Sequence, residues 1–285
     1  MGKAMKSGRR ARDLAIRIFL TLIVAAGGIL ALLPIVWMLS TALKPPGQVF
    51  LVPPQWIPKP FVWANIPQAL DFMQAGLVFR NSFTIAILVI AGQLASSTLV
   101  GFGFARIPVK GKNILFLFVL SGIVLPYQAV LIPQFILFSK LHWINSYKPL
   151  IIPQLAGAPF FIFLARQFFM GIPRELDDAA RIDGCGYFRI YSQVILPLSK
   201  PLLGIIAIQS FMDTWNDFLA PLIYLNSSTK YTVALALANF TADYGMTPWN
   251  LLMVASLTAL LPCIALFFIG QKFFIQGITI TGLKG

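Results

Sequence analysis

The sequence RELDDAARIDGCGYFRIYSQVILP at residues 174–197 is a charged, helix-patterned segment in an otherwise apolar chain. Four of the nine acidic residues of the chain lie in it: Glu175, Asp177, Asp178 and Asp183. The chain as a whole is 58% hydrophobic and only 11% charged, whereas a soluble domain carries about 25% charged residues. This composition indicates an integral membrane protein, in which segment 174–197 is predicted to contact a partner in water.

The net charge of +13 does not indicate nucleic-acid binding, because the lysines and arginines cluster beside apolar runs, as membrane topology requires. Cys185 and Cys263 lie in a polar loop and in an apolar run, so neither a disulfide nor a metal site is predicted. The basic N-terminus precedes an apolar run that is longer than a signal peptide and lacks a small-residue cleavage site. A retained anchor helix is therefore expected there.

Apolar runs of about 20 residues, the length that crosses a bilayer core, define the expected architecture. We expect an all-α, polytopic fold with a basic N-terminus at 1–17, a membrane domain at 18–275 and a tail at 276–285. Six spans are predicted at about 18–43, 81–105, 113–138, 149–168, 201–225 and 248–271. Prolines inside these spans are expected to kink the helices. Membrane helices tolerate such kinks because neighbouring helices bond the backbone groups that a proline leaves free.

The distribution of basic residues predicts the orientation in the membrane. With the N-terminus inside, 16 of the 22 lysines and arginines fall on the inner side. The positive-inside rule therefore places both termini and the loop 166–200 in the cytoplasm. Residues 44–67 then lie outside. They contain seven prolines, which favour extended turns over a regular helix, so an ordered external loop is expected.

The segment 174–197 is itself predicted to form two short helices. Pro173 suits a first helical turn, and the acidic residues that follow it are favoured by the helix dipole. Gly184 supplies a C-terminal stop, and a second helix with apolar residues at helical spacing is expected to end at Pro197. Physical chemistry alone leaves open an amphipathic hairpin on lipid headgroups, although an anionic leaflet repels carboxylates.

The spacing Asp178-Ala179-Ala180, three residues, Gly184, nine residues, and Val-Ile-Leu-Pro ending at Pro197 resembles the EAA motif of ABC importer permeases. The sequence TWNDFLAPL at 214–222 is similar to the carbohydrate-uptake branch, in particular to the maltose-type second permease. The resemblance covers nearly the whole chain. It implies a type I ABC importer permease fold and a cargo that is a sugar, an oligosaccharide or a related glycoside, without naming which.

The same resemblance implies a set of partners in a bacterial or archaeal inner membrane. These are a second permease in a heterodimer, two cytoplasmic ABC ATPases and an extracytoplasmic solute-binding protein. The chain has no phosphate-binding loop of its own, since Gly111-Lys112 is followed by Asn113. We therefore expect a subunit that is not an enzyme and binds no cofactor, with ATP and Mg²⁺ used by the ATPases.

In this family the loop serves as a coupling helix that docks in a cleft on the ATPase. Asp178 would take the acidic docking position, where the usual glutamate is one methylene longer. The residues expected to couple to the ATPase are Glu175, Asp178, Ala179, Ala180, Arg181, Asp183, Gly184, Leu196 and Pro197.

Polar residues inside the predicted fifth span suggest a translocation pathway. Asp213, Asn216 and Asp217 stand at i, i+3 and i+4, which places them on one helix face, and a charge in the membrane needs water or a partner. Trp215 is a candidate for stacking on a sugar ring, and Gln128 is a weaker cavity candidate. In the alternative interpretation these residues hold the span to loops or to the second permease.

Two other classes of membrane protein remain as alternatives. A secondary transporter usually has paired repeats, and no second half is recognisable here. A membrane scaffold subunit would have no solute pathway. Co-purification distinguishes the classes, because a permease brings a sister permease, ATPases and a binding protein.

Overall fold

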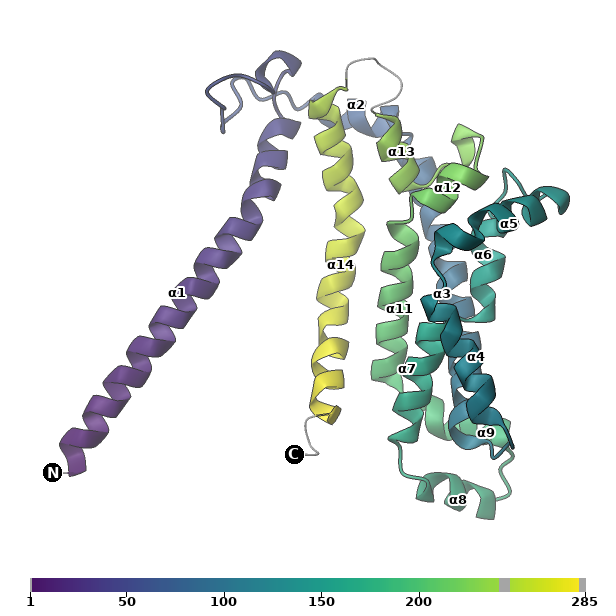
Figure 1. The fold of residues 1–285 in the computed structure, drawn as a ribbon. Coiled ribbons are helices and arrows are strands. Elements are labelled where there is room, and N and C mark those ends of the chain that lie inside the picture. The colour runs from purple at the N-terminus through teal and green to yellow at the C-terminus, as the bar shows by residue number, and fades with distance from the viewer. Residues whose placement is uncertain (1, 241–246, 282–285) are drawn as a thin grey trace. The chain divides into compact units, whose positions relative to one another are not determined.

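The structure, a computed structural model, describes residues 2–240 and 247–281. Every regular element in these two ranges is helical. The described chain forms two units, one of residues 2–71 with 247–258 and one of residues 72–240 with 259–281. Figure 1 gives the order of the elements along the chain.

The first unit contains the N-terminal helix and the proline-rich segment. Its elements are α1 (Gly2–Ala42), the 3-10 turn η1 (Pro46–Gln48), α2 (Asn65–Phe72) up to Asp71, and the first turns of α14 (Trp249–Thr281). The Asn65 side chain donates hydrogen bonds to the carbonyls of Ala42 (2.8 Å) and Lys44 (2.9 Å), which fixes the return of the chain after α1.

The proline-rich segment is ordered, but its end is helical. Pro67 was expected in an extended loop and instead lies in the first turn of α2, where a missing backbone N–H costs nothing. Trp56 packs edge-on against Trp37 of α1 at 5.1 Å between ring centroids.

The second unit is built around the long helix α3. The elements of this unit are, in chain order, α3 (Ala75–Arg106), α4 (Lys112–Val124), α5 (Tyr127–Lys140), α6 (Lys148–Ile151), η2 (Ile152–Ala156), α7 (Pro159–Met170), α8 (Glu175–Ile182), α9 (Tyr187–Ile190), η3 (Tyr191–Ile195), α10 (Leu196–Leu198), α11 (Lys200–Trp215), α12 (Leu219–Tyr224), η4 (Ser228–Lys230), α13 (Val233–Asn239) and the rest of α14.

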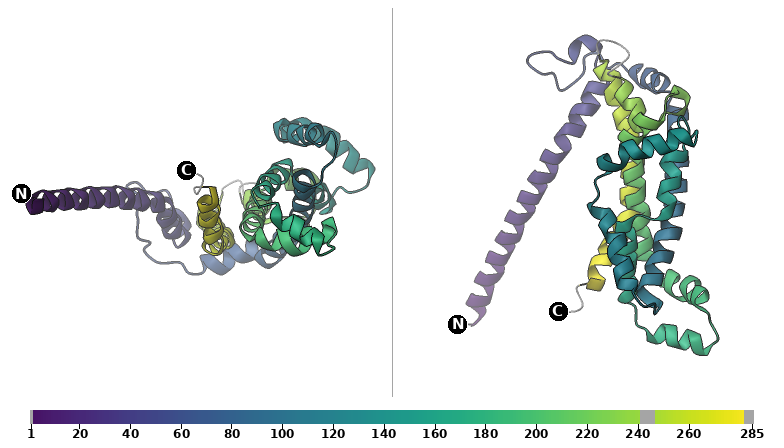
Figure 2. Two further views of the ribbon diagram at one scale, coloured as in Figure 1. Left: turned by 90° about the horizontal axis from the view of Figure 1, so that it is seen from below. Right: turned by 45° about the vertical axis from the view of Figure 1, so that its right-hand side comes forward.

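The helices α3, α7 and α11 run side by side in all views (Figures 1 and 2). Gly101 allows α3 and α7 to approach closely, because a Cβ there would lie 2.6 Å from the Cβ of Ala165. Phe102, Ala165, Ile190 and Ile206 belong to the buried core that these helices share with α9. The core therefore joins the membrane helices to the segment that follows α8.

Within residues 2–240 and 247–281, length and composition identify four helices that can cross a membrane: Ile16–Ala42, Ala75–Arg106, Lys148–Met170 and Trp249–Gln271. Two bent pairs raise the number to six if each pair is one span. The expected all-α, polytopic fold is thus present. The first part of the predicted tail 276–285 belongs to α14, which continues to Thr281, and residues 282–285 lie outside the described ranges.

Three predicted spans are not single helices, and one of them is the fourth, which passes through α6, η2 and α7. The third is divided into α4 and α5, which meet at an angle of 95°. Pro126 lies at this break and holds the preceding Leu125 in an extended conformation, so the helix cannot continue. The predicted fifth span ends as a helix at Trp215 and resumes as α12 at Leu219.

Candidate functional site

The helix α8 ends where its sequence predicts, but it begins at Glu175 with Arg174 as its N-cap, so Pro173 lies before the helix and not in its first turn. Glu175, Asp177 and Asp178 occupy its first turn. Gly184 follows the last turn with φ of +80°, and its N–H donates to the carbonyl of Arg181 at 2.9 Å. The N–H of Cys185 donates to the carbonyl of Ala180, also at 2.9 Å, which completes a Schellman motif. The helix therefore stops where its glycine adopts the left-handed conformation.

Most of α8 is exposed. Ile182 is 88% exposed and Leu176 is 40% exposed, so the helix presents apolar side chains beside its carboxylates. Figures 1 and 2 show α8 beyond the ends of α3, α7 and α11, at the end of the unit opposite to α12 and α13. The exposed residues among those predicted to couple are Glu175, Asp178, Ala179, Arg181, Asp183, Gly184 and Pro197.

Two predicted coupling residues instead face the protein. Ala180 is buried against the core, and Leu196 is half-buried and packs on the same core. Asp178 is exposed and lies 3.9 Å from Arg181 on its own helix, a weak surface pair. The α8 surface, defined here as the exposed side chains of Glu175–Ile182, thus has acidic and apolar character.

A buried ion pair that the sequence did not reveal anchors α8. The Nε atom of Arg106, at the end of α3, lies 3.5 Å from Oδ2 of Asp177, and both side chains are buried. The Nη2 atom of Arg106 also donates to the carbonyl of Ile172 at 2.8 Å, just before α8. Arg106 therefore holds both the approach to α8 and its first turn.

The second predicted helix of the segment is longer than expected and consists of three consecutive helical elements. The elements α9, η3 and α10 run from Tyr187 to Leu198, one residue past the predicted end at Pro197, and η3 is a π-helical turn. The hydroxyl groups of Tyr191 and Thr98 share a buried hydrogen bond of 2.7 Å. The segment is thus tied to α3 at a second point.

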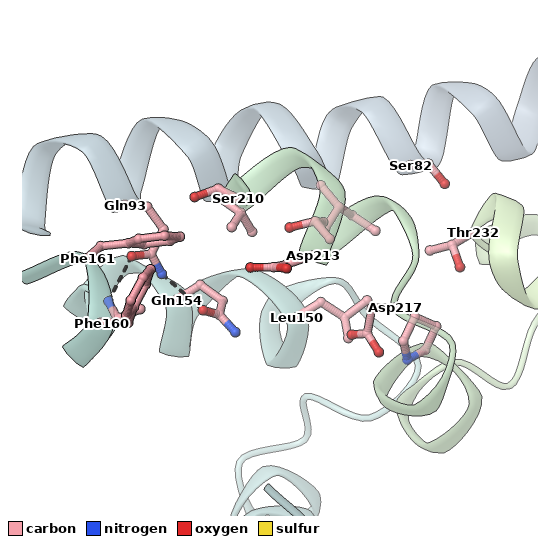
Figure 3. Close-up of a pocket in the computed structure, with 15 residues that line it drawn as sticks. Ser82, Gln93, Leu150, Gln154, Phe160, Phe161, Ser210, Asp213, Asp217 and Thr232 are labelled. Atoms are coloured by element: carbon pink, nitrogen blue, oxygen red, sulfur yellow. Dashed lines mark hydrogen bonds between the residues drawn. The ribbon is translucent and has the colours of Figure 1, made fainter. Parts of the chain in front are cut away.

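A cavity of about 220 Å³ with both polar and apolar lining residues lies in the same unit. Its polar lining residues are Ser82, Gln93, Gln154, Ser210, Asp213, Thr214, Asp217 and Thr232. Its apolar lining residues are Ile85, Val89, Leu150, Ala158, Phe160, Phe161 and Pro221. Figure 3 shows the Asp213 carboxylate in the middle of this space, between α3 and the segment that carries Gln154.

One wall of the cavity is a break in the fourth span. The chain passes from α6 through η2 to Gly157, whose φ of +86° interrupts the helix before α7 begins. Gln93 of α3 satisfies this break, because its Oε1 accepts from the Ala158 N–H at 2.8 Å and its Nε2 donates to Gln154 at 3.0 Å (Figure 3). Irregular backbone at membrane depth is tolerated where it lines such a cavity.

The structure brings together two of the five predicted pathway residues. Asp213 and Asp217 line the cavity. Trp215 is instead buried, with its indole N–H donating to the Ala259 carbonyl at 3.1 Å. Asn216 and Gln128 are exposed and do not line it.

The prediction that Asp213, Asn216 and Asp217 share one helix face is wrong. The α11 helix ends at Trp215, and the Asn216 side chain donates back to the Met212 carbonyl at 2.8 Å. Asp217 Oδ1 accepts from the Ala220 N–H at 3.2 Å and so caps the start of α12. The two carboxylates reach the cavity from two different elements.

Two further functional residues escaped the sequence reasoning. Arg106 was visible only as a charge at the end of an apolar run, although burying such a charge requires a partner. Ser210 gave no signal at all. It is buried in α11, lines the cavity, and its Oγ has no hydrogen-bond partner within the described structure.

Comparison with known proteins agrees with this arrangement. Residues 97–280 match the family described as binding-protein-dependent transport system inner membrane component. The arabinooligosaccharides transport system permease protein AraQ of Bacillus subtilis is 35% identical over 272 residues, which cover 94% of this chain and 96% of AraQ. The sn-glycerol-3-phosphate transport system permease protein UgpE of Yersinia enterocolitica is 30% identical over 281 residues, covering 96% and 98%.

A solved structure has the same fold. A chain of a bacterial ABC transporter involved in the import of the acidic polysaccharide alginate matches with a TM-score of 0.81 and 18% identity, covering 92% of this chain and 97% of that one. Together with the family match, this confirms the resemblance drawn from segment 174–197. The chain belongs to the binding-protein-dependent transport system inner membrane components, and is a non-catalytic, multi-pass permease subunit of an ABC importer in the inner membrane.

Proposed function

We propose that this subunit imports a sugar or an oligosaccharide, and that α8 couples it to an ATPase. The observation that carries the coupling proposal is the α8 surface: a short helix with exposed apolar and acidic side chains, anchored to α3 by a buried ion pair. A sugar is supported by the relatives, since AraQ is named for arabinooligosaccharides. The cavity offers hydroxyl, amide and carboxylate groups, which suit sugar hydroxyls.

The proposed assembly has four kinds of partner. A second permease would complete the pathway, two cytoplasmic ATPases would use ATP and Mg²⁺, and a solute-binding protein would deliver the sugar from outside. This chain would bind no cofactor. Three of the predicted coupling residues, Glu175, Asp178 and Asp183, would face basic or backbone donors of the ATPase. Ile182, which was not among the predicted coupling residues, would fill an apolar part of the cleft.

Both termini and the α8 surface would face the cytoplasm. The basic residues support this orientation, because 16 of 22 lie on the side of the N-terminus. The opposite side would hold the loop at 44–64 and the segment around α12 and α13.

The test is assembly and uptake with an apolar-to-charged substitution on α8. Ile182→Asp should abolish co-purification of the ATPase and ATP-dependent uptake of labelled oligosaccharide, because the carboxylate would be desolvated in the cleft. Val109→Asp is the matched control, since Val109 is an exposed residue of the loop between α3 and α4. Retained ATPase binding by Ile182→Asp would contradict the assignment of α8.

A further inference from the structure

We infer that the cavity beside Asp213 is a cargo site of this subunit, and that it accepts hydroxyl-rich neutral sugars and rejects anionic ones. The inference rests on the proposed function and specifies its substrate class. The inference favours the cargo class of one relative over that of another, because AraQ is named for arabinooligosaccharides and UgpE for the anion sn-glycerol-3-phosphate.

The first step is the irregular backbone that borders the cavity. A helix span is broken beside it, and Gln93, which is only 2% exposed, satisfies the break with two hydrogen bonds. Secondary transporters build their substrate sites from broken helices of this kind, where irregular backbone lines a cavity. The space therefore has the backbone construction of a binding site.

The second step is an unused hydrogen-bonding group. Ser210 is 3% exposed, lines the cavity, and has no partner for its Oγ in the described structure. A buried hydroxyl without a partner is costly. A ligand hydroxyl would supply the missing hydrogen bond.

The third step is the charge of the lining. Asp213 and Asp217 both line the cavity, and neither forms an ion pair among the described residues. Asp213 accepts one hydrogen bond from Gln209 at 2.9 Å, and Asp217 accepts from the start of α12, so oxygen lone pairs remain available. The lining residues include no lysine and no arginine.

These three observations determine the class of ligand. Carboxylates accept hydrogen bonds and repel negative charge, so the cavity favours a donor-rich neutral molecule and disfavours a phosphate or a uronate. Phe160, which is half exposed at 51%, offers an apolar ring face to a sugar.

The test measures sugar binding to the purified complex of this chain with its sister permease and ATPases, with the binding protein omitted. The probes are two neutral trisaccharides, arabinotriose and maltotriose, and the anionic trigalacturonate, observed by saturation-transfer NMR. The wild type should bind a neutral trisaccharide and not trigalacturonate. Ser210→Ala should weaken neutral binding by about tenfold, the effect of one lost hydrogen bond.

Asp213→Asn keeps the shape of the side chain and removes one charge, so it should allow trigalacturonate to bind. Ser121→Ala is the matched control, because it removes the same hydroxyl from an exposed residue of α4 that does not line the cavity. Equal binding of the neutral and anionic probes by the wild type would overturn the inference, as would a Ser121→Ala effect as large as that of Ser210→Ala.

Absence of binding for all three probes would also overturn it. Uptake by the complete importer, measured in parallel, keeps this result distinct from a failure of the proposed function. A complex that imports sugar but binds none in this cavity would retain the transport assignment and lose the cargo site.

Discussion

Gly184 is the residue on which the end of α8 depends. Its φ of +80° lies in the left-handed region, where a side chain costs about 1–2 kcal/mol and a β-branched one is least tolerated. A Cβ added there would meet no atom within 4 Å. The cost of a substitution inside the subunit is therefore backbone strain alone, and any further effect must come from what α8 touches.

Gly184→Val should abolish ATP-coupled uptake while leaving membrane insertion intact. The strain would unwind the Schellman motif and shift the α8 surface, and the added volume would face the ATPase. Uptake assays and immunoblots of the membrane fraction measure the two effects separately. Gly186→Val is the control, because Gly186 has an extended backbone with φ of −76° and ψ of 167° that valine adopts readily. Normal uptake by Gly184→Val would contradict the coupling role of this turn.

At the scale of elements, α8 is attached to one end of the long helix α3, where Asp177 pairs with Arg106. The 32 residues of α3 extend about 48 Å at 1.5 Å per residue. At its other end Asn81 donates to the carbonyls of Thr229 and Tyr231, and between the two ends Gln93 borders the cavity. Under the proposed coupling, a displacement of α8 would reach the cavity wall through this one helix.

Asp177 and Asp178 should therefore have separate roles, although they are adjacent. Asp177→Ala leaves the buried Arg106 guanidinium without its counter-charge and should destabilise the subunit by about 3–5 kcal/mol. The double variant Arg106→Met/Asp177→Leu should recover most of that stability. Asp178→Ala, on the exposed face, should leave stability unchanged and lower ATPase-coupled uptake.

Thermal unfolding of the purified complex, monitored beside uptake and ATP hydrolysis, checks these three variants. If Asp177→Ala melted at the wild-type temperature, the ion pair would not anchor α8. If Asp178→Ala lowered the melting temperature as much as Asp177→Ala, the division between an anchoring and a docking carboxylate would be wrong.

The features that the sequence predicted are local in the chain. The stop at Gly184 depends on one backbone conformation, and the all-α membrane fold depends on apolar runs, so both can be read from a few neighbouring residues. The pairing of Arg106 with Asp177 joins residues 71 positions apart, and Gln93 meets Gln154 across 61. Tertiary packing selects such partners, and the spacing of residues along the chain does not predict them.

The bends escaped prediction for a related reason. Pro126 was expected to kink one span, whereas the angle between α4 and α5 is 95°. The end of α11 at Trp215 follows from side chains of Asn216 and Asp217 that bond the backbone locally. Helical spacing alone takes no account of this local competition, and it therefore places the three polar residues on one helix face.

At the scale of the whole molecule, the distribution of charge predicts which surface meets which compartment. The proposed docking of the α8 surface on a cytoplasmic ATPase requires loop 166–200 to lie inside, and the five lysines and arginines of that loop favour this orientation. The loop at 44–64 would then face the solute-binding protein. The sidedness of two exposed residues, Lys59 and Ile182, is therefore a test of the complete arrangement.

Cysteine labelling measures this sidedness after Cys185 and Cys263 are replaced by serine and alanine. A membrane-impermeant maleimide should label Lys59→Cys in intact spheroplasts, whereas Ile182→Cys should react only after the membrane is permeabilised. Purified ATPase added to inside-out vesicles should protect Ile182→Cys from the reagent and leave Lys59→Cys unlabelled. Labelling of Ile182→Cys in intact spheroplasts would contradict the proposed topology, because α8 would then lie outside the compartment in which ATP is hydrolysed.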